Sequence, residues 1–313
     1  MCTIIWATGN LYNTEWEYDW IKELFIDAIS LNESKKEIIW INDTACNLDP
    51  ISNAIIVFYI KSANDQTRLN NYINKYNTSH TYFSLIHLSD EYYSCNYNIY
   101  NSIYCKYIYR NYWHPQLNFD KIKTFALGYK IGFWNTYNKP KTEIINEDKS
   151  IPWCFSGDFK DRHPDRRLSV TKFMQIKDGF FKEETGNSFS NRQTGLKTTD
   201  YRNLFLKSKF ALCPIGNVNL DTFRLYEALE CGCIPVVTNI SVNQNYNPSY
   251  WTYIFKTTNI PFVIENNWDK CVERVQFLLS YPDLYKQMQH DVIEFWCNYK
   301  SNLKTQLYKD LII

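Results

Sequence analysis

The chain has 313 residues, of which 45% are hydrophobic, so it can fill more than one core, and this length favours two domains. Its formal net charge of +1 excludes a strongly basic nucleic-acid scaffold. The ten cysteines form no Cys-x-x-Cys pair, and we find neither a secretory leader nor an apolar run of membrane-spanning length. We therefore expect a cytoplasmic protein without a membrane segment, and we interpret most of the 25 tyrosines as compositional drift.

Strand-like and helix-like patterns alternate along the first half of the chain. This alternation predicts a doubly wound α/β domain over residues 1–140. Strands are expected at 3–6, 37–41, 53–59, 81–88 and 105–110, and helices at 16–29 and 67–76.

A polar stretch without periodicity, residues 135–150, is the predicted linker to a second α/β domain at 151–284. Within and after that domain, strands are expected at 153–157, 179–181, 210–213 and 234–237, helices at 166–175, 200–207, 222–230, 268–279 and 282–299, and short elements at 251–255 and 261–264.

Residues 210–237 form the most informative segment, because they read as a strand, a Pro-Gly loop, a short helix and a second strand. Ligands of such units bind outside the carboxyl ends of the strands, where a helix N-terminus can hold a pyrophosphate. Asp221 is the expected N-cap. Arg224 and Glu227 share one helix face, so they are placed to bind phosphate and ribose hydroxyls; the alternative is an intrahelical ion pair.

A second candidate segment begins at Gly157, which would permit close backbone approach at the end of its strand. The arginines that follow offer bidentate donors for phosphate oxygens, and Arg167 is the preferred one. The alternative for Arg162 and Arg166 is a solvated basic helix start.

The third candidate segment is His87 to Glu91, which follows a strand in the first domain. A histidine and two adjacent carboxylates there could abstract a proton. The alternative is that Ser89 or Asp90 caps a following helix. Arg110 also follows a strand, where it would reach the same site or brace the domain.

Several classes of site are disfavoured because the sequence lacks their motifs. The five histidines are scattered, and no Asp-x-Asp pair follows an apolar strand to hold a nucleotide-bound Mg²⁺, so no metal is expected. The chain also lacks a P-loop, a Gly-x-Gly-x-x-Gly turn and a Gly-x-Ser-x-Gly elbow, which argues against NTPase, dehydrogenase and hydrolase functions.

The 210–237 segment resembles the nucleotide-sugar motif of exostosin-type glycosyltransferases. The matching pieces are Cys213-Pro214-Ile215-Gly216, Arg224-Leu225-Tyr226-Glu227-Ala228 and Gly232-Cys233-Ile234-Pro235-Val236. Three further pieces resemble a branch that includes ribitol xylosyltransferase and exostosin-like proteins of large DNA viruses: His87-Leu88-Ser89-Asp90-Glu91, Arg110-Asn111-Tyr112-Trp113 and Leu127-Gly128-Tyr129-Lys130.

The resemblance implies a GT-B fold, in which two Rossmann-like domains face each other across a cleft and a helix within residues 285–313 crosses back to the first domain. It implies an inverting, metal-independent transferase that needs no cofactor, uses a UDP-sugar, with UDP-xylose as the first choice, and acts on a hydroxyl of a glycan acceptor. Animal members carry a membrane anchor, so its absence here favours a viral enzyme of the host cytoplasm.

The resemblance also implies roles for individual residues. The catalytic base is Asp90 or Glu91, with Glu15 and Glu17 as reserves, and His87 and Arg110 belong to the acceptor side. The expected nucleotide-sugar contacts are Gly157, Arg167, Pro214, Gly216, Asn219, Asp221, Thr222, Arg224 and Glu227.

Three alternatives stay open: a nucleotide-sugar epimerase, a transferase acting on a nucleic-acid base, and an inactive sugar-nucleotide-binding partner of another transferase. The base-modifying alternative would need a basic groove, which the net charge disfavours. The donor sugar, the linkage and the oligomeric state do not follow from the sequence, because pentose and hexose donors differ by one hydroxymethyl group.

Overall fold

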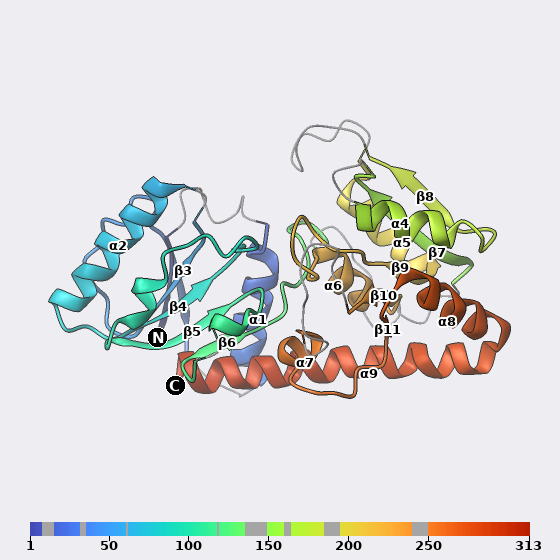
Figure 1. Cartoon of the computed structure of the whole chain (residues 1–313). Helices are drawn as coiled ribbons and strands as arrows, with labels where there is room; N and C mark the ends of the chain where they lie inside the picture. The colour runs from blue at the N-terminus through green and yellow to red at the C-terminus, as the bar shows by residue number, and fades with distance from the viewer. Residues whose placement is uncertain are drawn as a thin grey trace. The chain divides into compact units, whose positions relative to one another are not determined.

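The computed structural model divides the chain into two compact units: unit 1 contains residues 1–127 and 299–313, and unit 2 contains residues 128–298. Each unit is built on one parallel sheet (Figure 1). The structure describes residues 1–7, 16–31, 36–60, 62–117, 119–134, 149–159, 164–184, 195–239 and 250–313.

The sheet of unit 1 has the strand order β2-β1-β3-β4-β5-β6, with every neighbouring pair parallel. Its strands are β1 (Cys2–Trp6), β2 (Ile38–Asn42), β3 (Ala54–Phe58), β4 (Phe83–His87), β5 (Cys105–Arg110) and β6 (Ile122–Thr124). Its helices are α1 (Tyr18–Leu31) and α2 (Ala63–Thr78), with short 3₁₀ turns η2 (Tyr97–Asn101) and η3 (Pro115–Leu117). The strand order reverses between β1 and β3, and ligands of open parallel sheets bind outside the strand ends at such a point.

Alternating side chains of the strands cover both faces of this sheet. Ile5 and Ile56 pack with Leu69 of α2 in one buried cluster. The next residue along β1, Trp6, points to the other face, where its ring lies 5.6 Å from that of Tyr18 in α1. The two helices therefore cover opposite faces, as Figure 1 shows, and β3 and β4 are buried along their whole length because both faces are covered.

The sheet of unit 2 has the order β11-β10-β9-β7-β8, again with parallel neighbours, and its order reverses between β7 and β9. Its strands are β7 (Ile151–Gly157), β8 (Phe180–Glu183), β9 (Ser208–Leu212), β10 (Ile234–Thr238) and β11 (Val263–Glu265). Its helices are α4 (Pro164–Phe173), α5 (Thr198–Lys207), α6 (Phe223–Glu230), α7 (Tyr250–Phe255), α8 (Trp268–Ser280) and α9 (Pro282–Leu307), which continues into a π-helical turn, η4 (Tyr308–Ile312).

A buried lysine forms hydrogen bonds with the carboxyl ends of two helices of unit 2. The Nζ of Lys149 donates to the carbonyl oxygens of Phe205 at 3.1 Å, Leu206 at 3.0 Å and Cys231 at 2.9 Å. The first two carbonyls end α5 and the third caps α6. A cation is favourable there because the last carbonyls of a helix have no partner within the helix.

Helix α9 contributes to both units. Its Trp296 donates from Nε1 to Glu230 of unit 2 at 2.9 Å. Nearer its end, Lys304 contacts Asp27 of α1 at 2.5 Å, and Asp310 of η4 accepts a hydrogen bond from Tyr109 of β5 at 2.6 Å.

The predicted pattern of two parallel α/β domains is confirmed by the two sheets. The change from one unit to the other falls at residue 128, earlier than the predicted linker at 135–150, and most of that linker lies outside the described residues. Among the helices that the structure describes, none has both the length and the apolar character needed to cross a bilayer.

Candidate functional site

In unit 2, the carboxyl end of β7 meets the first turn of α6. Arg224 donates from Nε to the hydroxyl of Tyr201 at 2.6 Å and from Nη2 to the carbonyl oxygen of Ser156 at 3.1 Å. Its guanidinium carbon lies 4.5 Å from the centre of the Phe155 ring. A Cβ on Gly157 would lie 2.8 Å from Nη2. Glycine therefore leaves the space in which the guanidinium is held at the reversal point of the sheet.

Glu227 lies one turn further along α6 and is only 5% exposed. Its Oε1 accepts a hydrogen bond from the backbone N–H of Lys130 at 3.2 Å. Burial raises the pKa of Glu227 to about 7. The hydrogen bonds of Arg224 go to Tyr201 and Ser156, so the intrahelical ion pair that the sequence left open is not what orients this arginine.

The loop after β9 is held by the start of α4. Arg166 donates to the carbonyl oxygens of Ile215 at 3.1 Å and Gly216 at 2.7 Å. Asp165 accepts from the N–H of Ile215 at 3.0 Å and from the indole of Trp268 at 2.7 Å. Arg166 is thus a brace for the loop rather than the solvated helix start that the sequence allowed.

The other arginines near α4 are placed differently. The side chain of Arg167, the predicted phosphate ligand, is exposed on α4. Arg162 lies outside the described residues. The sequence offered Arg166 either as a phosphate ligand or as part of a solvated helix start, and its hydrogen bonds to the loop fit neither role.

The N-cap of α6 is Thr222, not Asp221 as predicted from the sequence. Asp221 precedes the cap and donates its backbone N–H to Oδ1 of the fully buried Asn219 at 3.2 Å. The carbonyl oxygen of Asn219 in turn accepts from the N–H of Gly216 at 2.8 Å, which closes the loop. Within the part of the chain described, the buried hydroxyl oxygen of Thr222 has no hydrogen-bond partner.

The structure thus brings most of the predicted nucleotide-sugar residues into one corner around the ends of β7 and β9 and the start of α6. This donor-side corner comprises Gly157, Pro214, Gly216, Asn219, Asp221, Thr222, Arg224 and Glu227. Free N–H groups at the start of a helix and a nearby guanidinium are suited to bind a diphosphate.

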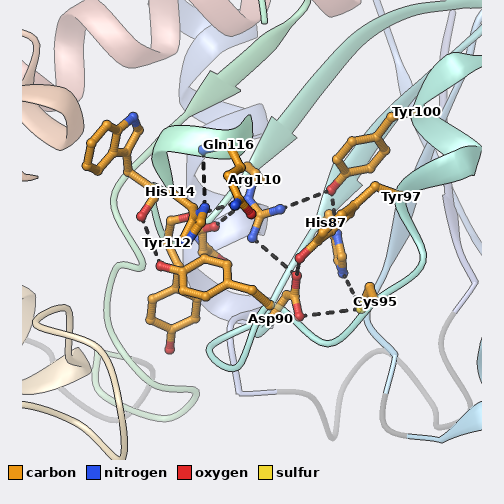
Figure 2. A network of polar contacts seen from close by, with 12 residues as sticks. His87, Asp90, Cys95, Tyr97, Tyr100, Arg110, Tyr112, His114 and Gln116 are labelled. Carbon is orange, nitrogen blue, oxygen red and sulfur yellow. Dashed lines mark hydrogen bonds and ion pairs between the residues drawn. The ribbon is translucent and has the colours of Figure 1, made fainter. Parts of the chain in front are cut away.

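A second polar cluster lies in unit 1, behind the ends of β4 and β5 (Figure 2). Arg110 and Asp90 form a buried ion pair at 3.2 Å. The same Oδ2 of Asp90 accepts from the hydroxyl of Tyr97 at 2.6 Å, and Oδ1 accepts from the thiol of Cys95 at 3.4 Å. Burial by itself would raise the pKa of Asp90, but His87, Tyr97 and Arg110 outweigh it and hold the pKa below its ordinary value. A carboxylate held in its charged form in this way is a weak proton acceptor.

His87 belongs to the same cluster. Its Nδ1 lies 2.6 Å from the hydroxyl of Tyr100 and its Nε2 3.6 Å from Sγ of Cys95, while its ring stacks on Phe58 with 4.4 Å between ring centres. Burial lowers the pKa of His87 to about 3, so the imidazole is neutral near pH 7. Tyr97 and Tyr100 are therefore structural partners here and not products of compositional drift.

Ligand atoms of His87, Asp90 and Cys95 lie within 4.8 Å of one another. Sequence reasoning missed this cluster because it considered only the spacing of the histidines. The donor set would suit zinc, which binds thiolate, imidazole and carboxylate. However, the guanidinium of Arg110 already balances the charge of Asp90, and burial raises the pKa of Cys95, which keeps its thiol protonated. We interpret the cluster as a hydrogen-bonded network, and the expectation that the enzyme works without metal stays a prediction.

Two of the remaining predicted carboxylates, Glu17 and Glu91, fall within the described residues. Glu17 is 1% exposed just before α1, and its Oε1 accepts a hydrogen bond from the hydroxyl of Ser89. Glu91 is half-buried next to Asp90, and Glu15 lies outside the described residues. The helix cap that the sequence offered for Ser89 or Asp90 is wrong, because the next helical element is η2, whose N-cap is Asn96.

Comparison with known proteins gives a family match over part of the chain. Residues 165–312 match the model of the RXYLT1 C-terminal domain. Human ribitol-5-phosphate xylosyltransferase 1 is 24% identical over 121 residues, which cover 36% of this chain and 27% of the human protein. The mouse protein of the same name is 27% identical over 126 residues, or 38% of this chain and 28% of the mouse protein. The chain thus spans about a quarter of the length of these relatives.

Two solved structures are similar to this chain over most or all of its length. One is Anabaena Alr3699/HepE in complex with UDP and glucose, with a TM-score of 0.49, 8% identity and full coverage of both chains. The other is the pneumococcal O-GlcNAc transferase GtfA in complex with UDP and GlcNAc. It has a TM-score of 0.45 and 10% identity, and the match covers 83% of this chain and 57% of that structure. The family match runs from α4 to η4, so this segment, which contains the loop and the helix of the donor-side corner, is similar to the RXYLT1 C-terminal domain.

Proposed function

We propose that this protein is a glycosyltransferase that takes its sugar from a UDP-sugar bound at the donor-side corner. The observation that carries this proposal is the match of residues 165–312 to the RXYLT1 C-terminal domain, because the matched segment contains Arg224 and Glu227. The geometry supports it independently. The corner lies at the reversal point of a parallel sheet and offers a cation and a helix start to a phosphorylated ligand.

Three residues of the corner, Arg224, Glu227 and Thr222, have proposed roles in binding the donor. Arg224, held by Tyr201 and Ser156, would bind the diphosphate without first having to be ordered. The buried Glu227 would accept hydrogen bonds from ribose hydroxyls. Thr222 would donate its hydroxyl to a phosphate oxygen beside the N–H groups of α6. These contacts stabilise the negative charge that develops on the leaving diphosphate when the sugar is transferred.

The donor and acceptor follow only from the names of the relatives. Both matched relatives are named ribitol-5-phosphate xylosyltransferase 1, so we propose xylose as the donor sugar and an acceptor hydroxyl on a ribitol-phosphate glycan. We also propose direct displacement with inversion at the anomeric carbon and no requirement for metal.

The test is a donor screen in two steps. Thermal shift with UDP, UDP-xylose, UDP-glucose and UDP-GlcNAc identifies ligands that bind the folded state and raise its melting temperature. UDP release is then measured with each binding donor, with and without ribitol-phosphate acceptors and in the presence of EDTA. We expect the largest shift and acceptor-dependent release with UDP-xylose, and no loss in EDTA.

Arg224→Ala is the diagnostic variant, and Arg274→Ala, an exposed arginine on α8 of the same unit, is its matched control. Arg224→Ala should lose the UDP-induced shift, whereas the control keeps it. If the wild type binds UDP but turns over no donor, the protein is an inactive binding partner. If Arg224→Ala binds UDP as the wild type does, the donor site lies elsewhere.

A further inference from the structure

Tyr201 lies in the first turn of α5, and its hydroxyl contacts Arg224 of α6 and the carboxyl end of β7. It accepts a hydrogen bond from Nε of Arg224 at 2.6 Å and donates to the carbonyl oxygen of Ser156 at 3.3 Å. The same carbonyl oxygen accepts from Nη2 of Arg224 at 3.1 Å. Ser156 is held in turn, because its Oγ donates to Oε1 of Glu184 at 2.8 Å. Tyr201, Ser156 and Arg224 thus form a closed ring of hydrogen bonds.

The ring of hydrogen bonds leaves one side of the Arg224 guanidinium free. A guanidinium is a planar group with several N–H donors, and here Nε and Nη2 are the nitrogens that protein groups hold. One face of the plane lies against Phe155, with 4.5 Å from the guanidinium carbon to the ring centre. Nη1 donates no hydrogen bond to any residue that the structure describes. Arg224 can therefore offer Nη1, together with the second N–H of Nη2, to the oxygens of a ligand.

Helix α5, which carries Tyr201, is joined to α6 at both ends. At the carboxyl ends, Nζ of Lys149 donates to the carbonyl oxygens of Phe205 in α5 and of Cys231, the C-cap of α6. At the amino ends, the hydrogen bond between Tyr201 and Arg224 connects the first turns of the two helices. The ring of Tyr201 also packs edge-on against that of Phe205, one turn further along α5, with 4.6 Å between ring centres. The hydroxyl of Tyr201 is therefore held at a fixed position beside α6.

Among the described residues, the groups that hold Arg224 are uncharged: a phenol, a carbonyl oxygen and an aromatic ring. Burial raises the pKa of Tyr201, so its hydroxyl keeps its proton at neutral pH and continues to donate to Ser156. A carboxylate in the place of this phenol would form an ion pair with the guanidinium and neutralise it. The uncharged partners instead orient Arg224 and leave its positive charge for a bound anion.

We propose that Tyr201 is the positioning residue of Arg224: its hydroxyl holds the guanidinium so that the side with Nη1 binds the diphosphate of the donor. This inference rests on the proposed binding of a UDP-sugar at the donor-side corner and deepens it. It requires nothing outside unit 2, because α5, α6 and β7 all belong to that unit. A guanidinium that is already held in place loses less side-chain entropy when the ligand binds, and this strengthens binding.

The test is a double-mutant cycle on the affinity for UDP, measured by titration calorimetry. Tyr201→Phe removes the hydroxyl and keeps the ring that packs on Phe205. Arg224→Lys keeps the positive charge but loses the planar group that forms hydrogen bonds with Tyr201 and Ser156 together. The matched control is Tyr285→Phe on α9, because the Tyr285 hydroxyl is buried without a hydrogen-bond partner among the described residues. Urea unfolding checks that each variant is folded.

We expect Tyr201→Phe to weaken UDP binding about tenfold, because an arginine released from the ring of hydrogen bonds must be ordered by the ligand. Arg224→Lys should weaken binding by roughly a hundredfold relative to the wild type. In the Arg224→Lys background, Tyr201→Phe should change the affinity by less than about twofold, since the lysine does not use the hydroxyl. Tyr285→Phe should bind UDP as the wild type does.

The outcomes separate this proposal from the proposed function. Wild-type affinity in Tyr201→Phe overturns the positioning role and leaves the proposed function standing. A further loss of about tenfold in the Arg224→Lys background also overturns the role, because the effects then add and Tyr201 does not act through Arg224. An equal loss in Tyr285→Phe overturns it as well, since any change to a buried tyrosine would then weaken binding. A wild type that binds neither UDP nor a UDP-sugar overturns both proposals.

Discussion

The guanidinium nitrogen Nη2 of Arg224 occupies the space beside Gly157, at 2.8 Å from where a Cβ would stand. Gly157→Ala should therefore displace the guanidinium from Ser156 and weaken UDP binding about tenfold, with little loss of stability because the displaced group is the end of a flexible side chain. Titration calorimetry with UDP measures the affinity. Unchanged affinity would show that the guanidinium position is not used.

A second glycine gives the opposite expectation and serves as the contrast. A Cβ on Gly179 would stand 2.0 Å from the Trp153 ring, whose indole donates to the carbonyl oxygen of Ile176 at 2.9 Å. Gly179→Ala should overpack this site and lower the free energy of unfolding by about 2 kcal/mol. The melting temperature of unit 2 should fall accordingly. UDP affinity, measured below the transition, should stay near the wild-type value.

Glu227→Gln should have opposite effects on binding and on stability. Burial raises the pKa of this carboxyl from the ordinary 4.5 to about 7. The folded state therefore binds more protons than the unfolded state between these values, and the contribution of Glu227 to stability falls as the pH rises through that window. Glu227→Gln should be more stable than the wild type above pH 7 and should bind UDP more weakly.

Urea unfolding at several pH values measures the first effect, and UDP titration at the same pH values measures the second. In the wild type, UDP affinity should rise as the pH passes about 7, because the charged carboxylate is the better acceptor for ribose hydroxyls. Glu273→Gln, an exposed glutamate on α8, is the control and should change neither quantity. A pH-independent UDP affinity would contradict the ribose role.

Arg110→Met should destabilise the protein by about 3 kcal/mol, because it leaves the Asp90 carboxylate buried without its cation. The pKa of Asp90 is held below the ordinary 3.8, so its contribution to stability is present above that value and is lost as the pH falls through the lower, folded-state pKa. The variant should lose this acid-side dependence. Lys106→Met on the exposed face of the same strand should be near neutral.

Lys149→Met should cost about 3 kcal/mol, because carbonyl oxygens at the ends of α5 and α6 lose a buried cation. Lys270→Met tests whether the effect depends on burial, since Lys270 is exposed in an ion pair with Glu273 at 2.6 Å and should contribute little. Equal effects of the two variants on the urea midpoint would contradict the capping role of Lys149.

The donor-side corner could be predicted from the sequence because most of its residues are local. Gly216, Thr222, Arg224 and Glu227 lie within one strand-loop-helix unit, where spacing alone sets which side chains meet. The prediction of the N-cap was wrong by one residue: the sequence indicated Asp221, and the structure has Thr222. Helix boundaries are commonly uncertain by one or two residues.

The network of unit 1 could be predicted only as a set of candidates. The ion pair joins residues 20 apart, and Ser89 meets Glu17 across 72 residues, so sheet register and not local spacing decides these contacts. Left-handed φ at Ser89 and Tyr93 has no signal in the residue type, because tertiary packing imposes it. For the same reason the sequence could not show that Asp90, of the predicted carboxylates, is held in an ion pair.

Unit 1 contains residues from both ends of the described chain, because residues 299–313 belong to it. These residues are synthesised after the whole of unit 2. During synthesis, the hydrogen bond between Tyr109 of β5 and Asp310 of η4 can therefore form only after the whole of unit 2 has been made. The sheet of unit 1 can pair its strands earlier, because all six lie before residue 125, but it gains the packing of residues 299–313 last.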